Sequence, residues 1–154
     1  MALKIGDNLP EFSLYNQSKE LILSTSFKNK FLVIFFYPKD DTPGCTKEVC
    51  GFRDLYFELK NIGSEIIGIS SDSINNHQKS AKNFYVNYNL LSDDKKKVRK
   101  LFGVPKSFFG LLPGRVTYIF DPNGKLLKII NSQFNINSHI TISKKIIKEH
   151  KISE

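Results

Sequence analysis

The chain has 154 residues, 40% of them hydrophobic, and a formal net charge of +8 at pH 7. This length suits one domain, so we treat residues 1–154 as a single unit that can bury its own core. Two cysteines are too few for a disulfide scaffold, and no apolar run approaches the roughly 20 residues that a membrane span needs.

The positive charge comes largely from lysines that are spread along the chain. The densest cluster, Lys95 to Lys100, follows Asp93 and Asp94 on an expected helix. Acidic residues at the start of a helix and basic residues at its end suit the helix dipole. We therefore expect a solvated helix face, and a nucleic-acid surface is the alternative.

The first expected elements are short strands and one long buried strand. Leu9 to Leu14 and Leu21 to Leu23 flank the polar turn 16–19 and predict a hairpin. The apolar run from Phe31 to Phe36, which Pro38 ends, is typical of a strand buried on both faces.

A helix is expected next, from Pro43 to about Asn61, with Gly63 closing it. Its apolar positions recur at helical spacing: Val49, Phe52, Leu55, Tyr56 and Leu59. Glu65 to Ser70 reads as a second buried strand, and the Ser-Asp-Ser run 71–73 offers an N-cap for a helix through about Val86.

The remaining elements follow in the order strand, helix, strand, strand and helix. Their expected ranges are Leu90–Leu91, Lys95–Phe102 (ended by Gly103), Val116–Phe120, Lys125–Ile130 and Asn137–Lys148, with a turn at 121–124. Two buried strands joined by a helix form a βαβ unit, and the closing hairpin and helix extend its sheet. The pattern predicts a thioredoxin-like α/β sandwich with an added N-terminal β-hairpin.

Cys45 lies in the first turn of the helix that starts at Pro43. Backbone N–H groups and the positive end of the dipole favour a thiolate there, and the thiolate is the reactive form. The alternative is a small buried apolar residue. No apolar face of the helix includes Cys45, which favours a reactive thiol.

Cys50 follows five residues later and is a candidate partner for Cys45, with a buried structural cysteine as the alternative. Residues five apart on an α-helix have Cα atoms roughly 8.5 Å apart. A disulfide tolerates at most about 7 Å. A Cys45–Cys50 disulfide therefore needs the first turns of the helix to unwind.

A metal site is not expected, because the three histidines, His77, His139 and His150, lie far from the cysteines in sequence. We also expect Asp40, Asp41 and His77 to be surface residues.

Pro38, Thr42 and Cys45 resemble the peroxiredoxin signature Pro-x-x-x-Thr-x-x-Cys. The continuation from Cys45 to Asp54 is similar to the Q branch of that family, also called bacterioferritin comigratory protein. The resemblance runs from Gly6 to the last helix. It implies the peroxiredoxin fold and an atypical 2-Cys, thiol-dependent peroxidase.

The resemblance implies that the Cys45 thiolate attacks hydrogen peroxide or an alkyl hydroperoxide and becomes a sulfenic acid. Cys50 then resolves it as an intramolecular disulfide, and thioredoxin or a similar dithiol reduces the disulfide. No metal, haem or flavin is needed.

The resemblance also gives roles to the neighbours of Cys45. Thr42 serves the bound peroxide, although its hydroxyl is equally suited to cap the helix. Pro38 shields the thiolate from water. Gly44 lets the backbone approach a ligand, so that its N–H and that of Cys45 can donate to the peroxide.

Arg115 opens a segment that resembles the peroxiredoxin pattern Arg-x-Thr-Phe-x-Ile-Asp, with Tyr118 for the phenylalanine. A guanidinium near Cys45 stabilises a thiolate and binds peroxide; an exposed strand-edge arginine is the alternative. In relatives, the acid at the Glu48 position orients this arginine. A surface charge on the helix explains Glu48 equally well.

Two other functions stay open at the level of sequence. A thioredoxin-type disulfide oxidoreductase usually has Cys-x-x-Cys, whereas four residues separate these cysteines. A nucleic-acid-binding module needs aromatic or arginine-rich surfaces, and this chain is poor in arginine. We expect a soluble, cytoplasmic monomer, in which the apolar segment 107–113 is either a pocket wall or a dimer contact.

Overall fold

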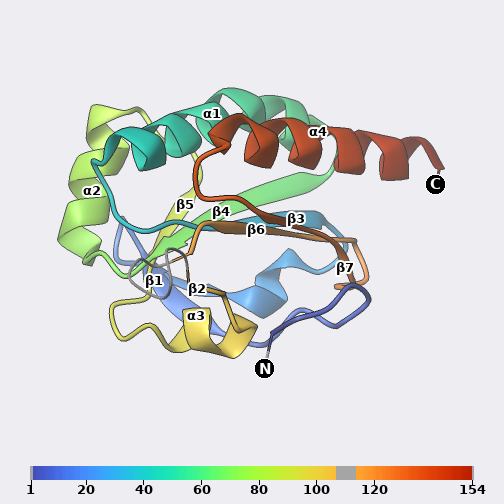
Figure 1. Ribbon diagram of the computed structural model, residues 1–154, viewed down its shortest axis with the longest axis horizontal. Helices are drawn as coiled ribbons and strands as arrows, with labels where there is room; N and C mark the ends of the chain where they lie inside the picture. The colour runs from blue at the N-terminus through green and yellow to red at the C-terminus, as the bar shows by residue number, and fades with distance from the viewer. Residues whose placement is uncertain (1, 107–113, 154) are drawn as a thin grey trace.

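The computed structural model describes residues 2–106 and 114–153. Within them, seven strands form one mixed sheet in the order β2-β1-β5-β4-β3-β6-β7, with helices on both faces (Figure 1). The strands are β1 (Ser13–Asn16), β2 (Leu21–Leu23), β3 (Phe31–Phe36), β4 (Ser64–Ser70), β5 (Asn89–Ser92), β6 (Val116–Phe120) and β7 (Leu126–Asn131). The helices are η1 (Ser24–Phe27), α1 (Pro43–Asn61), α2 (Ile74–Asn83), α3 (Lys97–Phe102) and α4 (Ile136–Ser153). The expected pocket wall or dimer contact at 107–113 lies outside the described residues.

Strand β3 is the centre of the fold, and all six of its residues are buried. It pairs parallel with β4 and antiparallel with β6. Its side chains alternate between two cores, as the period of a strand requires. Phe31, Val33 and Phe35 join one apolar cluster, and Leu32, Ile34 and Phe36 join the other. The predicted strand buried on both faces is confirmed.

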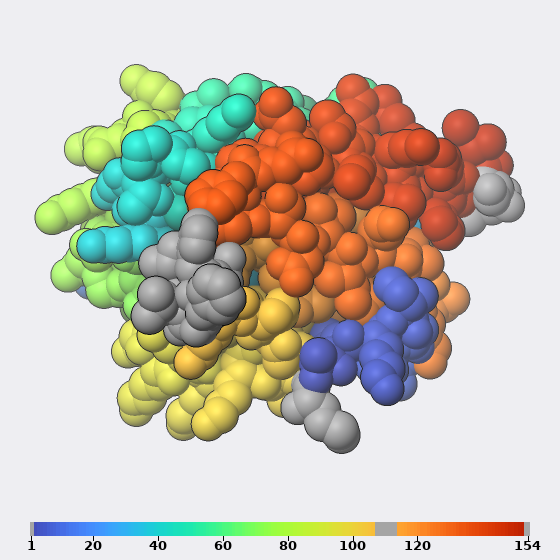
Figure 2. All heavy atoms as spheres, in the orientation of Figure 1, coloured from blue at the N-terminus to red at the C-terminus, as the bar shows by residue number. Residues whose placement is uncertain are grey.

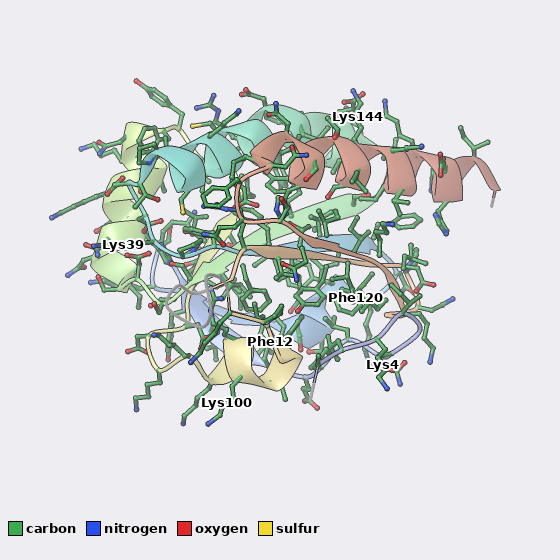
Figure 3. The ribbon with its side chains drawn as sticks, viewed as in Figure 1. Lys4, Phe12, Lys39, Lys100, Phe120 and Lys144 are labelled. Atoms are coloured by element: carbon green, nitrogen blue, oxygen red, sulfur yellow. The ribbon has the colours of Figure 1, made fainter. Side chains whose placement is uncertain are left out.

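The two cores are covered by different helices. Helices α1 and α4 lie side by side over one face of the sheet, and α3 lies over the other (Figure 1). Phe12 and Phe120 point into the core on the α3 side (Figure 3). No helix in the described ranges is long and apolar enough to cross a membrane.

The βαβ unit β3-α1-β4 positions the start of α1. The chain leaves β3 after Phe36 and turns, and α1 begins at Pro43, as predicted. Proline suits the first helical position because its missing N–H would have no helical partner there. Cys45 therefore sits in the first turn of α1, near the carboxyl end of β3.

The predicted first strand is wrong in its bounds, because β1 begins at Ser13 rather than Leu9. Pro10 has no N–H to give to a ladder. Leu9 N donates to Gly124 O, and Phe12 N donates to the Ser24 hydroxyl. Leu9 thus follows the β6–β7 turn, whereas Phe12 bonds to Ser24 just beyond β2.

Three helices also differ from their expected ranges. Helix α2 ends at Asn83 rather than Val86, since Tyr85 adopts a left-handed backbone with φ of 54°. Helix α3 begins at Lys97 because the Asp93 carboxylate caps it, accepting hydrogen bonds from two backbone N–H groups. Helix α4 begins one residue earlier than expected and runs on to Ser153.

Candidate active site

Cys45 is buried, with 1% of its surface exposed, in the first turn of α1. The first hydrogen bond within the helix runs from Thr46 N to Thr42 O at 2.8 Å. The N–H groups of Gly44 and Cys45 come before it, so the helix itself gives them no partner. This geometry favours an anion at the Cys45 sulfur.

Arg115 reaches Cys45 from the residue just before β6. Its Nη2 donates to Cys45 Sγ at 3.4 Å, its Nη1 to Glu48 Oε1 at 2.7 Å and its Nε to Gln133 O at 3.1 Å. The side chain is buried, which excludes the alternative of an exposed strand-edge arginine. Although burial opposes it, the negative groups at Glu48 and Cys45 raise the pKa of Arg115. The guanidinium is thus a fixed cation beside the sulfur.

Gly44 makes this approach of Arg115 possible. A Cβ atom at Gly44 would lie 3.1 Å from Arg115 Nη2, closer than side chains normally pack. We expected glycine here so that a ligand could approach the backbone. The structure adds a second reason, which is room for the guanidinium.

Glu48 is fully buried, so the alternative of a surface charge is wrong. One oxygen, Oε1, accepts from Arg115. The other, Oε2, has no hydrogen-bond partner among the described residues and lies 3.5 Å from His139 Nδ1. Burial raises the pKa of Glu48 to about 7, against the opposing effect of Arg115.

Thr42 occupies the N-cap position without capping the helix through its side chain. Its hydroxyl donates instead to Lys39 O at 3.1 Å, which leaves the oxygen lone pairs for another donor. Capping and peroxide binding therefore do not compete for this oxygen.

An open pocket of about 320 Å³ adjoins these groups. Its lining comes from the start of α1, the segment before it and the segment that leads into α4: Pro38, Thr42, Gly44, Cys45, Arg115, Gln133, Phe134 and Ile136. Figure 2 shows the cyan start of α1 against the orange-red start of α4. The pocket brings together every site residue expected from the sequence except Glu48, which lies behind Arg115, and Cys50.

Cys50 lies one turn further along the unbroken helix α1, and both thiols are free. It is half-buried, and Arg53 Nη1 donates to its sulfur at 3.6 Å. The helix therefore keeps the two cysteines at the separation of roughly 8.5 Å between Cα atoms that helix geometry gives.

Arg99 is a site residue that sequence reasoning missed. Its guanidinium donates to Tyr37 O at 3.1 Å and to Gly114 O at 2.9 Å. Burial lowers the pKa of Arg99, while negative groups, Cys45 among them, act against this. Arg99 stands in a run of lysines that we expected to be a solvated helix face. The one signal in the sequence was that residue 99 is an arginine among lysines.

The expectation that Asp40 and His77 are surface residues is wrong, because both are buried. His77 Nδ1 lies 2.6 Å from Asp40 Oδ2, and Asp40 N donates to Asp72 Oδ2 at 2.8 Å. Asp41 is exposed as expected and accepts a hydrogen bond from Ser80. The network fixes the loop before α1 to α2.

The same network gives the one candidate metal cluster in residues 2–106 and 114–153. Asp40, Asp72 and His77 bring three ligand atoms within 4.8 Å of one another. These side chains already form hydrogen bonds with one another, with Tyr37 and with Ser70. His77 Nε2 also lies 3.0 Å from Leu91 O. The cluster is built as a hydrogen-bond network.

The sequence profile of the AhpC/TSA family matches residues 5–129. The chain is 44% identical over 146 residues to the chloroplastic peroxiredoxin Q of Sedum lineare, with 95% of this chain and 78% of that protein covered. It is 47% identical over 135 residues to the chloroplastic peroxiredoxin Q of Gentiana triflora, with 88% and 62% covered.

Two solved structures show the same likeness. Peroxidoxin BcpB from Mycobacterium tuberculosis superposes with a TM-score of 0.86 at 33% identity, covering 96% of this chain and 97% of that one. The bacterioferritin comigratory protein of Xanthomonas campestris, described for its alkyl peroxide reduction activity, superposes with a TM-score of 0.84 at 25% identity. The coverage there is 94% of this chain and 99% of that one. These likenesses confirm the expected thioredoxin-like sandwich.

Proposed function

The chain belongs to the AhpC/TSA family and shares its thiol peroxidase function, and we propose that Cys45 is the residue that attacks the hydroperoxide. The observation that carries this assignment is the Arg115 guanidinium, held between Cys45 Sγ and Glu48 Oε1 in a buried site. A fixed cation and a helix N-terminus both stabilise the thiolate nucleophile.

In the first step, the Cys45 thiolate attacks one oxygen of the hydroperoxide. An S–O bond forms to the terminal oxygen and the O–O bond breaks, so that Cys45 becomes a sulfenic acid and an alkoxide or hydroxide leaves, which water then protonates. Arg115 and the N–H groups of Gly44 and Cys45 face the charge that develops on the oxygens. The Thr42 oxygen can accept a hydrogen bond from the hydroperoxide O–H while its own O–H donates to Lys39 O.

The pocket favours hydrogen peroxide and alkyl hydroperoxides. Phe134 and Ile136 give its outer wall apolar surface beside the polar groups at Cys45. The Xanthomonas campestris relative is described for alkyl peroxide reduction. Pro38 also lines the pocket and limits water near the sulfur.

In the second step, the Cys50 sulfur attacks the sulfenic sulfur, and a disulfide forms as water leaves. A dithiol protein of the thioredoxin type then supplies two electrons and restores both thiols. In the reduced protein, Arg53 Nη1 donates to the Cys50 sulfur at 3.6 Å.

The assignment is tested with two single substitutions and a peroxide assay that contains thioredoxin, its reductase and NADPH. Cys45→Ser should abolish peroxide consumption, because the nucleophile is lost. Cys50→Ser should consume one equivalent of peroxide per chain and stop at the sulfenic acid, which dimedone traps. Multiple turnovers by Cys45→Ser would overturn the assignment. A disulfide oxidoreductase would instead reduce insulin and leave peroxide untouched.

A cytoplasmic location stays a prediction, which fractionation of the source cells with an antibody to the chain would test. The plant relatives named above are chloroplastic.

A further inference from the structure

His139 is buried against Glu48 and has no part in the cycle described above. It lies on α4, and its Nδ1 is 3.5 Å from Glu48 Oε2, with neither side chain exposed. Glu48 in turn holds Arg115, and Arg115 holds Cys45. Four side chains from three elements of the sandwich thus form one continuous chain of contacts.

The hydrogen bonds of His139 leave its charge open. Nε2 lies 2.8 Å from Ser132 O, and a carbonyl only accepts, so this nitrogen carries a hydrogen. Nδ1 lies 2.7 Å from Thr117 Oγ1, and a hydroxyl can either donate or accept. Both the neutral ring and the charged ring therefore fit the site.

Glu48 Oε2 is the atom that needs explaining. It is buried and has no hydrogen-bond partner among the described residues. A buried carboxylate oxygen without a donor is destabilising. One proton removes the problem, whether it sits on Glu48 Oε2 or on His139 Nδ1, because either state makes the pair neutral.

We propose that His139 is a positioning residue of the peroxidase site. The Glu48–His139 pair holds one exchangeable proton, and this proton governs how far the Arg115 charge stabilises the Cys45 thiolate. The inference rests on the proposed role of Cys45. It adds a group on α4 that acts on the sulfur only through Glu48 and Arg115.

The charges around the pair give the direction of the effect. Arg115 faces Glu48 from the residue before β6, Cys45 shares α1 with Glu48, and Tyr88 interacts with Glu48 from the residue before β5. Burial, with the Glu48 charge next, raises the pKa of Tyr88 well above its usual value, so the phenol stays neutral. Arg99 adds a second cation near Cys45.

With the proton present, the Arg115 charge is balanced by the Cys45 thiolate alone. Without it, the carboxylate and the thiolate share the same cation, and the thiolate is less favoured. Burial raises the pKa of Glu48 to about 7, whereas burial, together with the Arg115 charge, lowers the pKa of His139. Below about pH 7 the proton therefore rests on Glu48.

The test measures Cys45 alone, in a Cys50→Ser background, through the rate of alkylation by iodoacetamide from pH 5 to pH 9. We expect one inflection from the thiol and a second near pH 7 from the pair. Glu48→Gln should remove the second inflection. His139→Leu should move it, because the substitution removes the polar group that lies 3.5 Å from Glu48 Oε2.

His150→Leu is the matched control, because His150 lies on the same helix, is exposed and faces only its own helix at Ile146 O. It should leave both inflections in place. Two results would overturn the proposal and leave His139 with a structural role only. In one, His139→Leu slows alkylation by the same factor at every pH. In the other, it alkylates at the same rates as its Cys50→Ser parent.

A measurement on the unmutated chain covers the case in which the variants do not fold. The carboxyl ¹³C resonance of Glu48 should titrate near pH 7 while the imidazole ¹⁵N shifts of His139 report the neutral Nε2–H ring. If neither group titrates between pH 5 and pH 9, the proposal is wrong. Neither assay uses peroxide, so an inert Cys45 in the peroxide assay is a separate result.

Discussion

Arg115 is the residue on which the chemistry at Cys45 most depends, since its three hydrogen bonds fix the guanidinium in one place. Arg115→Met keeps the length of the side chain and removes the charge. Thr42→Val removes the hydroxyl that faces the pocket. We expect each variant to slow sulfenic acid formation by about 10²–10³-fold, the usual loss for one directed donor. Stopped-flow mixing with peroxide measures the rate.

Arg115→Lys is the control for charge alone. A lysine cannot bridge Cys45 and Glu48 with two parallel donors, so we expect it to recover only part of the rate. Thermal unfolding should show all these variants folded. Wild-type rates in both Arg115→Met and Thr42→Val would contradict their assigned roles.

The buried pair of Asp40 and His77 carries a prediction about stability. His77→Ala would leave the Asp40 carboxylate with Tyr37 as its remaining side-chain donor and would remove the imidazole from Leu91 O. Removing one member of a buried polar pair costs about 3–5 kcal/mol of unfolding free energy. Urea unfolding at pH 7 checks this, with the exposed His150→Ala as control. A loss no larger than that of the control would show that the network contributes little.

Residues that act within one local turn could be predicted from the sequence, and residues that act across the fold could not. Pro38, Thr42 and Cys45 lie in a single strand-to-helix connection, and the motif shows them directly. The burial of Glu48 depends on contacts with Arg115, 67 residues away, and with His139 on α4. No periodicity along the chain reports those contacts.

At the scale of elements, α1 does two jobs that conflict. Its first turn activates Cys45, and the same intact helix keeps Cys50 out of disulfide reach. Gly51 packs so closely against Ile140 of α4 that a Cβ there would clash, and Phe52 stacks on Phe35 with ring centroids 4.5 Å apart. The helix is therefore anchored from Gly51 onward, so an opening that brings the cysteines together has to involve the turns before it.

We expect oxidation to unwind α1 from its start to about Gly51. Amide hydrogen exchange between Thr46 and Cys50 should become faster in the oxidised protein, while Leu55–Leu59 and strand β3 stay protected. Cys50→Ser, treated with peroxide in the same way, is the control because it cannot form the disulfide. Equal protection of Thr46–Cys50 in both redox states would rule out the switch. A dimer on non-reducing electrophoresis would show an intermolecular disulfide instead.

The bounds of the elements were predictable where apolar spacing decided them, as for α1, β3 and β6. The predicted bounds were wrong where a single polar group or backbone angle sets the end of an element. The Asp93 carboxylate moves the start of α3, and the left-handed Tyr85 ends the α2 segment early. Such capping and turn geometry is set by one residue and leaves little trace in a pattern.

At the scale of the whole molecule, lysines lie on several sides of the fold. Lys4, Lys39, Lys100 and Lys144 point outward from four different sides of the sandwich (Figure 3). Dispersed charge of one sign favours repulsion between copies over a nucleic-acid groove. The preference for solvated surfaces over a nucleic-acid patch stays a prediction.

The described surface also predicts that the protein is a monomer. The two edges of the sheet are β2, which is three residues long, and β7, whose outward positions include Lys128. Short and charged edges oppose edge-to-edge pairing. Of the nine large exposed apolar side chains in the described residues, three (Tyr15, Leu21 and Leu23) lie together on the β1–β2 hairpin. The other six (Ile5, Phe57, Tyr85, Leu101, Phe134 and Ile152) come from separate segments, whereas a stable interface buries about 800 Å² on each partner.

Sedimentation equilibrium of the reduced, full-length chain at physiological salt and at about 1 M salt tests the monomer. The Debye length falls from about 8 Å to about 3 Å between these conditions, so high salt removes most of the repulsion from the net charge of +8. We expect one protomer mass at both, because the edges and the scattered apolar groups oppose association without help from charge. A dimer at high salt alone would show that charge keeps the copies apart. A dimer at physiological salt would contradict the prediction and direct attention to segment 107–113, which the full-length chain includes.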